Sequence, residues 1–225
     1  MIHRLLRKIR SVKADASIRS FHQFEGSSLA YERLVAACEE CREQLRPAHE
    51  EYVKNVSRPD MAASLELGAL LLALCRINRW RSLLDLGSGF SSFVFRWYAR
   101  ETPGVTVCSV DDDPVWLKRT SSFLTGNQLR VDNLLVLDDF LRADFAPFDC
   151  ILHDLNFVEV RIHHVEEVLQ RLAPAGLAIF DDAHKADYRA ALMKILSSRG
   201  ATYSLQPVTR DVYGRYALAF APRAK

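Results

Sequence analysis

The chain has 225 residues, of which 49% are hydrophobic and 26% charged, and its formal net charge is +2. This balance is typical of a soluble globular protein and excludes disordered, collagen-like and disulfide-scaffold classes. The small net charge argues against a nucleic-acid partner. The five cysteines are an odd number, which favours reduced thiols and a cytoplasmic location.

The first thirteen residues combine five basic side chains with apolar residues at helical spacing, and no acid precedes Asp15. This pattern predicts a basic amphipathic helix. Two interpretations are open. The helix packs on the protein itself or on a second subunit, giving a homodimer, or it contacts an anionic membrane surface.

Two further helical patterns cover residues 29–46 and 61–77, and cap-type residues at 57–60 form a turn before the second. Ser, Asp and Pro are the residues that commonly begin helices. We therefore expect residues 1–80 to form a helical extension or cap, followed by one domain over residues 81–225.

After Arg81 the pattern changes to short apolar runs that alternate with helical stretches. Such alternation predicts parallel strands joined by crossover helices, which is a doubly wound, Rossmann-like α/β sheet of seven strands. The expected strands are 82–86, 105–110, 134–137, 150–153, 177–180, 202–205 and 216–220, and the expected helices are 92–100, 114–124, 158–172 and 185–198. The last two strands are joined without a helix, so the final strand is expected to be antiparallel.

In an open α/β sheet the ligand binds beyond the carboxyl ends of the strands. Here all five central strands end in carboxylates: Asp85; Asp111, Asp112 and Asp113; Asp138 and Asp139; Asp154; and Asp181 and Asp182. A Gly-Ser-Gly turn after the first strand would aim backbone N–H groups at a ligand. Asp111 follows Gly89 by 22 residues, the spacing at which an acid reaches a ribose hydroxyl pair.

Two features of the turn weigh against a nicotinamide-dependent oxidoreductase. Ser92 stands where the dinucleotide fingerprint has its third glycine. Asp85 stands two residues before the first glycine, where a carboxylate would repel a pyrophosphate and suit a cationic amine.

The segments LLDLGSGFSS (83–92), VCSVDDDPVWL (107–117), FDCILHDL (148–155) and GLAIFDDAH (176–184) resemble class I S-adenosylmethionine-dependent methyltransferases. The resemblance covers about residues 82–221, with the four motifs in the family's order. It implies that the methionine part of S-adenosylmethionine is held by Asp85, Gly87, Ser88, Gly89 and Ser91. It further implies that Asp111 takes the ribose hydroxyls, that Asp112 and Leu155 flank the adenine, and that Asp139 and Phe140 lie at its edge.

A cation site is expected where Asp154, Asp181 and Asp182 end neighbouring strands. Carboxylate oxygens suit Mg²⁺ or another divalent cation, which would lower the pKa of a hydroxyl about to be methylated. The layout resembles the cation-dependent O-methyltransferases of the catechol and caffeoyl-CoA type. Phe157 stands where that subfamily has a lysine base, so His153 and His184 become the candidate proton acceptors.

The sequence thus predicts an S-adenosylmethionine-dependent methyltransferase that methylates an oxygen of a small molecule with the help of a divalent cation. The segment 49–64 and the loop 210–215 are expected to cover the acceptor pocket together. Two alternatives are open. One is metal-independent methyl transfer to nitrogen or carbon with a histidine base. The other is a non-catalytic cofactor-binding partner subunit that docks through residues 1–13.

Overall fold

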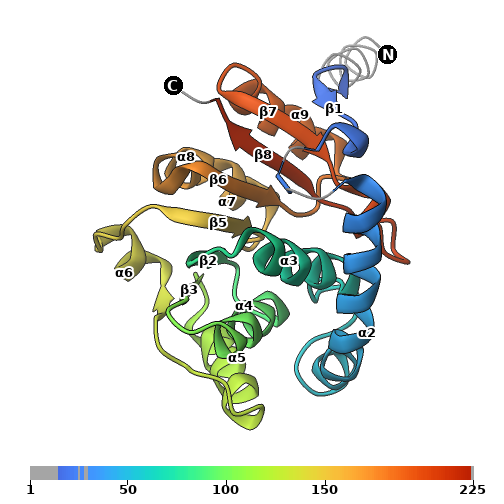
Figure 1. Cartoon of the computed structure of the whole chain (residues 1–225). Coiled ribbons are helices and arrows are strands. Elements are labelled where there is room, and N and C mark those ends of the chain that lie inside the picture. The colour runs from blue at the N-terminus through green and yellow to red at the C-terminus, as the bar shows by residue number, and fades with distance from the viewer. Residues whose placement is uncertain (1–14, 25, 28–29, 224–225) are drawn as a thin grey trace, which may run out of the picture.

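The computed structural model describes residues 15–24, 26–27 and 30–223, so the basic helix expected at 1–13 lies outside the described residues. The chain forms an eight-stranded sheet with the order β1-β7-β8-β6-β5-β2-β3-β4 (Figure 1). The strands are β1 (Ile18–Arg19), β2 (Ser82–Leu86), β3 (Thr106–Asp111), β4 (Leu134–Val136), β5 (Phe148–His153), β6 (Leu172–Phe180), β7 (Gly200–Ser204) and β8 (Leu218–Pro222).

The Rossmann-like architecture predicted from the sequence is confirmed. The neighbouring pairs among β2, β3, β4, β5 and β6 are all parallel, and β8 is antiparallel to both β6 and β7. One difference is β1, which adds an eighth strand parallel to β7. A strand of two residues is too short to leave a readable period in the sequence.

The α-helices are α2 (Tyr31–Asn55), α3 (Leu65–Asn78), α4 (Phe90–Glu101), α5 (Pro114–Gly126), α6 (Leu137–Arg142), α7 (Val158–His163), α8 (Val165–Arg171), α9 (Ala186–Leu196) and α10 (Gln206–Thr209). Two differ from expectation. α2 continues through Pro47, which has no N–H to donate to the carbonyl four residues earlier in the helix. Because Pro47 is exposed, water can reach that carbonyl. The helix expected at 158–172 is divided at His164, where ψ is 6°.

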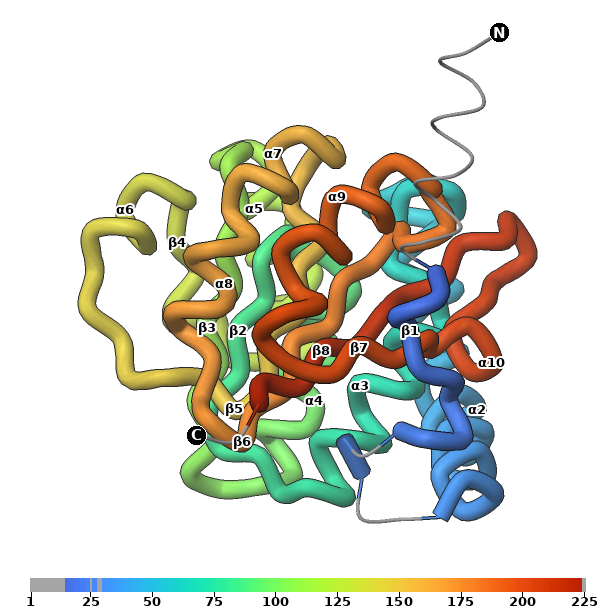
Figure 2. The backbone as a smooth tube through the Cα atoms, turned by 90° about the horizontal axis from the view of Figure 1, so that it is seen from above, coloured from blue at the N-terminus to red at the C-terminus, as the bar shows by residue number. Residues whose placement is uncertain are grey.

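The sheet is covered on both faces (Figure 2), with α3 and α4 on one side and α8 and α9 on the other. Successive strand residues therefore enter different apolar clusters, Leu83 joining the side of α3 and α4 and Leu84 the opposite side. This explains why the central strands read as continuous apolar runs.

The register brings four strand ends to one level. Leu86 of β2 lies opposite both Val110 of β3 and His153 of β5, and His153 lies opposite Phe180 of β6. The next residue along each strand is Gly87, Asp111, Asp154 or Asp181. Because β2 lies between β3 and β5, this is the point at which connections leave in opposite directions, where open α/β sheets bind ligands.

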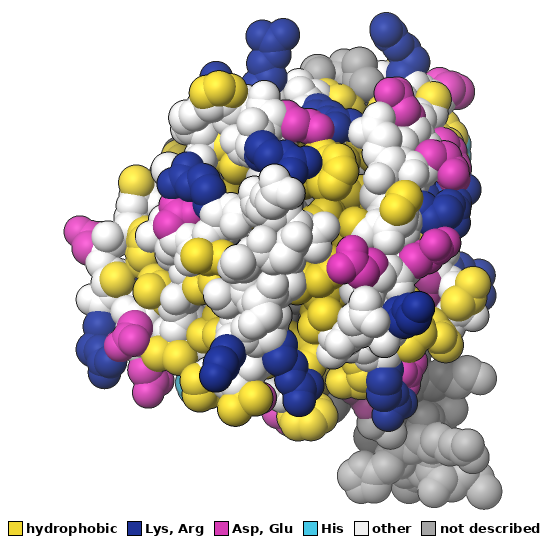
Figure 3. All heavy atoms as spheres, turned by 90° about the horizontal axis from the view of Figure 1, so that it is seen from below, with side chains coloured by type: hydrophobic (Ala, Val, Ile, Leu, Met, Phe, Trp, Pro, Cys, Tyr) yellow, Lys and Arg dark blue, Asp and Glu magenta, His cyan; other side chains and the backbone are white. Residues whose placement is uncertain are grey.

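On the face in Figure 3, basic, acidic and apolar side chains are intermixed rather than gathered by kind. None of the helices among the described residues is both long and apolar enough to cross a lipid bilayer. The expectations about nucleic acid, homodimer and membrane-surface contact stay predictions.

Candidate functional site at the strand ends

The glycine-rich turn between β2 and α4 is fixed against two neighbouring strands. The backbone N–H of Gly87 donates to the Val110 carbonyl at 2.9 Å, and that of Asp154 donates to Leu86 at 2.7 Å. Gly87 has a φ of 106°, and a Cβ there would lie 2.4 Å from the carbonyl oxygen of Asp154. Only glycine satisfies both conditions, so the backbone of the turn comes as close to β5 as it can.

Asp111 lies at the end of β3 and holds the turn from the other side. Its Oδ2 accepts hydrogen bonds from the backbone N–H of Ser88 at 2.8 Å and from the Ser88 hydroxyl at 3.0 Å. Its Oδ1 accepts one from the backbone N–H of Asp113 at 3.0 Å. Burial raises the pKa of Asp111, and these hydrogen bonds oppose the rise. The carboxylate predicted to bind ribose is therefore buried, orientated and adjacent to the turn.

Asp85 lies directly beneath the turn and is completely buried. Its Oδ2 accepts a hydrogen bond from the Ser92 hydroxyl at 2.5 Å, whereas Oδ1 has no hydrogen-bond partner among the described residues. Burial raises the pKa of Asp85 to about 7, although Ser92 and Ser91 oppose the rise. A buried carboxylate oxygen without a partner is costly, and an ammonium group placed there would satisfy it.

Two aromatic residues lie near the turn: Trp116, to which the sequence assigned no role, and Tyr52, which belongs to the segment 49–64 expected to cover the acceptor pocket. The indole N–H of Trp116 donates to the carbonyl of Ser88 at 2.6 Å. The hydroxyl of Tyr52, which α2 supplies, lies 3.0 Å from where a Cβ on Gly89 would be. Burial and the nearby carboxylates of Asp85 and Asp111 raise the pKa of Tyr52. Both rings thus border the space above Gly89 that a side chain would fill.

The helical extension and the loop after β7 meet beside this site. Arg215 donates from Nη1 to the carbonyl of Asp60 at 2.9 Å and from Nη2 to that of Pro59 at 3.1 Å. Its Nε donates to Asp211 at 2.6 Å. The segments 49–64 and 210–215 are therefore joined by hydrogen bonds, and that they cover an acceptor pocket together stays a prediction.

The residues expected around the adenine lie in different parts of the structure. Asp112 accepts a hydrogen bond from the side-chain amide of Asn156, which links the ends of β3 and β5. Phe140, in contrast, is fully buried in the apolar cluster on the α8 side, with the guanidinium of Arg171 4.3 Å from its ring centroid. Asp139 is exposed and pairs with Arg142 at 2.6 Å.

These contacts give Phe140 a packing position and Asp139 a surface position, and their place at the edge of the adenine stays a prediction. Leu155 is fully buried. Its backbone N lies 2.9 Å from where a Cβ on Gly87 would be, so its backbone lies beside the turn; that Leu155 flanks an adenine stays a prediction.

Two of the three carboxylates expected to bind a cation, those of Asp154 and Asp182, meet at one side chain of the protein, and Asp181 lies near enough to raise the pKa of Asp154. Arg161 of α7 contacts Asp154 at 2.6 Å and Asp182 at 3.1 Å, and Lys185 contacts Asp182 at 2.6 Å. Burial and neighbouring acids raise the pKa of Asp154 to about 8 against the effect of Arg161. Burial also acts to raise the pKa of Asp182, but Lys185 and Arg161 outweigh it and the pKa is lowered.

This arrangement corrects the expectation of a divalent cation at Asp154, Asp181 and Asp182. Oδ1 of Asp154 already pairs with the guanidinium of Arg161, and Oδ2 of Asp182 already accepts hydrogen bonds from that guanidinium and from the ammonium of Lys185. In the described part of the chain, no group of three or more His, Cys, Asp or Glu residues is arranged to hold a metal ion. The residues present do not fit the cation.

The two candidate histidines differ in access. His153 is completely buried, and its Nε2 lies 2.8 Å from the Arg161 carbonyl. Burial lowers its pKa to about 4. Because the ring faces the interior, the structure does not place His153 where it can take a proton from an acceptor. His184 is partly exposed, with Nδ1 3.5 Å from Oδ1 of Asp182.

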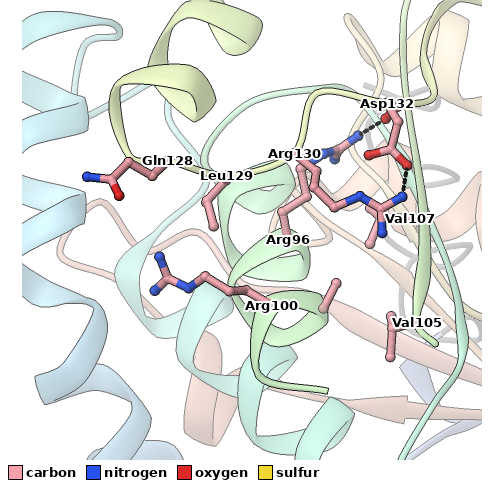
Figure 4. A pocket seen from close by; sticks show the side chains of 9 residues that line it. Arg96, Arg100, Val105, Val107, Gln128, Leu129, Arg130 and Asp132 are labelled. Carbon is pink, nitrogen blue, oxygen red and sulfur yellow. Dashed lines mark hydrogen bonds and ion pairs between the residues drawn. The ribbon is translucent and has the colours of Figure 1, made fainter. Parts of the chain in front are cut away.

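A separate cavity of about 80 Å³ lies between α4, the start of β3 and the loop before β4. Three of its lining residues are Arg96, Arg100 and Arg130 (Figure 4). Figure 4 shows Arg96 and Arg130 turned toward Asp132, while Arg100 points away from that pair. The cavity is far smaller than the roughly 300 Å³ or more of typical ligand pockets and does not belong to the strand-end site.

No protein-family model matches the sequence, and no curated protein is recognisably similar to it. The structure is similar to the O-methyltransferase TomG from Streptomyces achromogenes, involved in tomaymycin synthesis and solved with S-adenosylmethionine (SAM). The two are 21% identical, with a TM-score of 0.60 over 82% of this chain and 90% of that one. It is also similar to an O-methyltransferase from Bacillus cereus in complex with SAH, with 18% identity and a TM-score of 0.57 over 83% and 90% of the chains.

The SAH-bound methyltransferase PaMTH1 from Podospora anserina gives a TM-score of 0.59 at 14% identity, over 85% of this chain and 94% of that one. Each similarity extends over most of both chains. The protein therefore has the Rossmann-like fold of these methyltransferases, with an N-terminal helical extension.

Proposed function

We propose that this protein is an S-adenosylmethionine-dependent methyltransferase. The observation that carries the proposal is the buried Oδ1 of Asp85 beneath a glycine-rich turn, which has no hydrogen-bond partner in the part of the chain that the structure describes, together with Asp111 at the adjacent strand end. The first suits the ammonium group of the cofactor and the second its ribose hydroxyls. When bound, the cofactor supplies a methyl group on a positively charged sulfur.

We further propose that the methyl acceptor is an oxygen of a small molecule. The similarity to O-methyltransferases supports this choice. We also propose that the loop after β7 and the helical extension, which Arg215 ties together, cover the acceptor. His184 is proposed to take the proton of the acceptor hydroxyl, because His153 is enclosed in the core. Cofactor binding without turnover on a panel of hydroxylated small molecules would favour a non-catalytic partner subunit instead.

Replacing Asp111 by alanine is expected to weaken cofactor binding roughly 10- to 100-fold, because hydrogen bonds to a carboxylate contribute about 1.5–3 kcal/mol. Isothermal titration calorimetry with S-adenosylmethionine and with its demethylated product measures the loss. Asp144→Ala is the matched control, since it removes the same charge from an exposed loop. No binding by the wild type, or equal binding by Asp111→Ala, would contradict the proposed cofactor.

Cofactor affinity is expected to rise roughly eightfold between pH 6 and pH 7.5, because binding requires the charged form of Asp85. Burial raises the pKa of this carboxyl to about 7, so below that pH the free protein holds a proton there. The ammonium of the cofactor favours the charged carboxylate, so binding below pH 7 must release this proton. The release costs binding free energy, and the cost becomes small as the pH rises above 7.

The measurement is calorimetry at both pH values in buffers of different ionisation enthalpy, which also counts the protons released. Asp85→Asn cannot titrate and is expected to bind more weakly with no dependence on pH in this range. A wild-type affinity that is flat or falls from pH 6 to 7.5 would show that Asp85 does not meet the ammonium.

A further inference from the structure

Arg161 is enclosed at the centre of the carboxylate cluster, with only 7% of its side chain exposed. All three nitrogens of its guanidinium have partners. Nε donates to the carbonyls of Leu155 and Asn156, both at 3.2 Å, and Nη2 donates to Asn156 at 2.9 Å and contacts Asp154. Nη1 donates to Asp182 at 3.1 Å. The positive charge is therefore held from three sides by oxygens.

The backbone at two strand ends is bent toward this group. Asn156 follows β5 with a φ of 46°, and Asp182 follows β6 with a φ of 60°. Residues other than glycine are uncommon at positive φ, and Asn and Asp tolerate it best. Each of the two gives an oxygen to Arg161. Such local strain persists when contacts with the surrounding structure stabilise it. Here both strained residues contact the guanidinium of Arg161.

A divalent cation would have to compete for oxygens that are already engaged. Oδ2 of Asp182 accepts from both Arg161 and Lys185, and Oδ1 of Asp154 contacts Arg161. Mg²⁺ and Ca²⁺ need about six or more oxygens around them. Taking these oxygens would leave the guanidinium buried without a counter-ion, which is strongly unfavourable.

We propose that the guanidinium of Arg161 is the resident cation between the ends of β5 and β6, and that this site works without a divalent metal ion. The part of this inference that concerns the reaction rests on the proposed methyl transfer. Arg161 is a positioning residue. It fixes Asp154 and Asp182, and the backbone of Asp154 in turn supports the glycine-rich turn through Leu86.

The test is a titration of the full chain with Mn²⁺, followed by the electron paramagnetic resonance signal of the free ion. Wild type is expected to show no binding tighter than about 1 mM, the weak end of protein cation sites. Arg161→Gln frees the carboxylates and is expected to bind Mn²⁺ at least tenfold more tightly than wild type. Arg161→Lys is the matched control, since it keeps the charge and is expected to exclude the ion.

Stoichiometric Mn²⁺ binding by wild type that Asp182→Asn abolishes would overturn the proposal, as would an Arg161→Gln variant that is folded by circular dichroism and still has no affinity for the ion. If Arg161→Gln does not fold, wild type and Asp182→Asn decide between the outcomes. No acceptor or turnover is needed. A failure of the proposed methyl transfer would appear separately, as absent cofactor binding in calorimetry.

Discussion

Replacing Gly87 by alanine is expected to lower the free energy of unfolding by about 2–5 kcal/mol. Two costs combine. A residue with a Cβ at a φ of 106° loses roughly 1–2 kcal/mol, and forcing atoms into a closely packed place adds about 1–3 kcal/mol. The second cost applies because the new Cβ would lie 2.4 Å from the carbonyl oxygen of Asp154. Chemical denaturation followed by circular dichroism measures the change.

Gly104→Ala separates the two costs. Gly104 also has a positive φ, of 82°, but its Cβ would have only one neighbour, an Arg81 side-chain nitrogen at 3.4 Å. This variant is expected to lose only about 1–2 kcal/mol. Equal losses in the two variants would show that the turn is not held tightly against β5, and that the close approach is not essential to the site.

The glycine-rich turn and the acids at the strand ends were predictable from the sequence because their signals are local. Gly87 follows an apolar run, and Asp111 ends another at the spacing of a nucleotide-binding unit. The absence of a crossover helix between the last two expected strands predicted the antiparallel β8. The register then brings Gly87, Asp111 and Asp154 to one level, as parallel pairing requires.

The presence of Arg161 among the carboxylates was not predictable in the same way. The sequence showed Asp154, Asp181 and Asp182 at neighbouring strand ends, and carboxylates without a visible partner suggest a metal ion. Arg161 stands in a polar helical stretch, seven residues after Asp154, where an arginine is usually solvent-exposed. Only the bend at Asn156, with its positive φ, turns the start of α7 back over the strand ends. The spacing of apolar residues in the sequence does not predict such a bend.

The direction of the Phe140 side chain was also not predictable from the sequence. The resemblance implied a place for it at the edge of the adenine, and the structure shows that its ring packs in the apolar cluster under α8. α6 begins at Leu137, directly after β4, and this sets which helix positions face inward. Element boundaries are the least certain part of a sequence reading, and a shift of one residue changes the side chain that faces the site.

Replacing Arg161 by methionine is expected to lower the free energy of unfolding by about 3–5 kcal/mol, the usual cost of removing one partner from a buried ion pair. Methionine keeps the length and much of the volume of the side chain, so the loss reports the charge and its hydrogen bonds. The variant leaves Asp154 and Asp182 beside each other in the interior without their shared cation. Urea denaturation at fixed pH gives the difference.

The matched control is Arg199→Met, which breaks an ion pair with Glu166 whose side chains are 45% and 52% exposed. An exposed pair contributes only about 0–1 kcal/mol. Adding Asp182→Asn to Arg161→Met is expected to recover roughly 0.5–3 kcal/mol relative to the sum of the two single changes, because the second change removes a carboxylate that the first left without its cation. If Arg161→Met costs no more than Arg199→Met, the guanidinium does not neutralise the cluster. If the two changes are additive, Asp182 is not the carboxylate that depends on it.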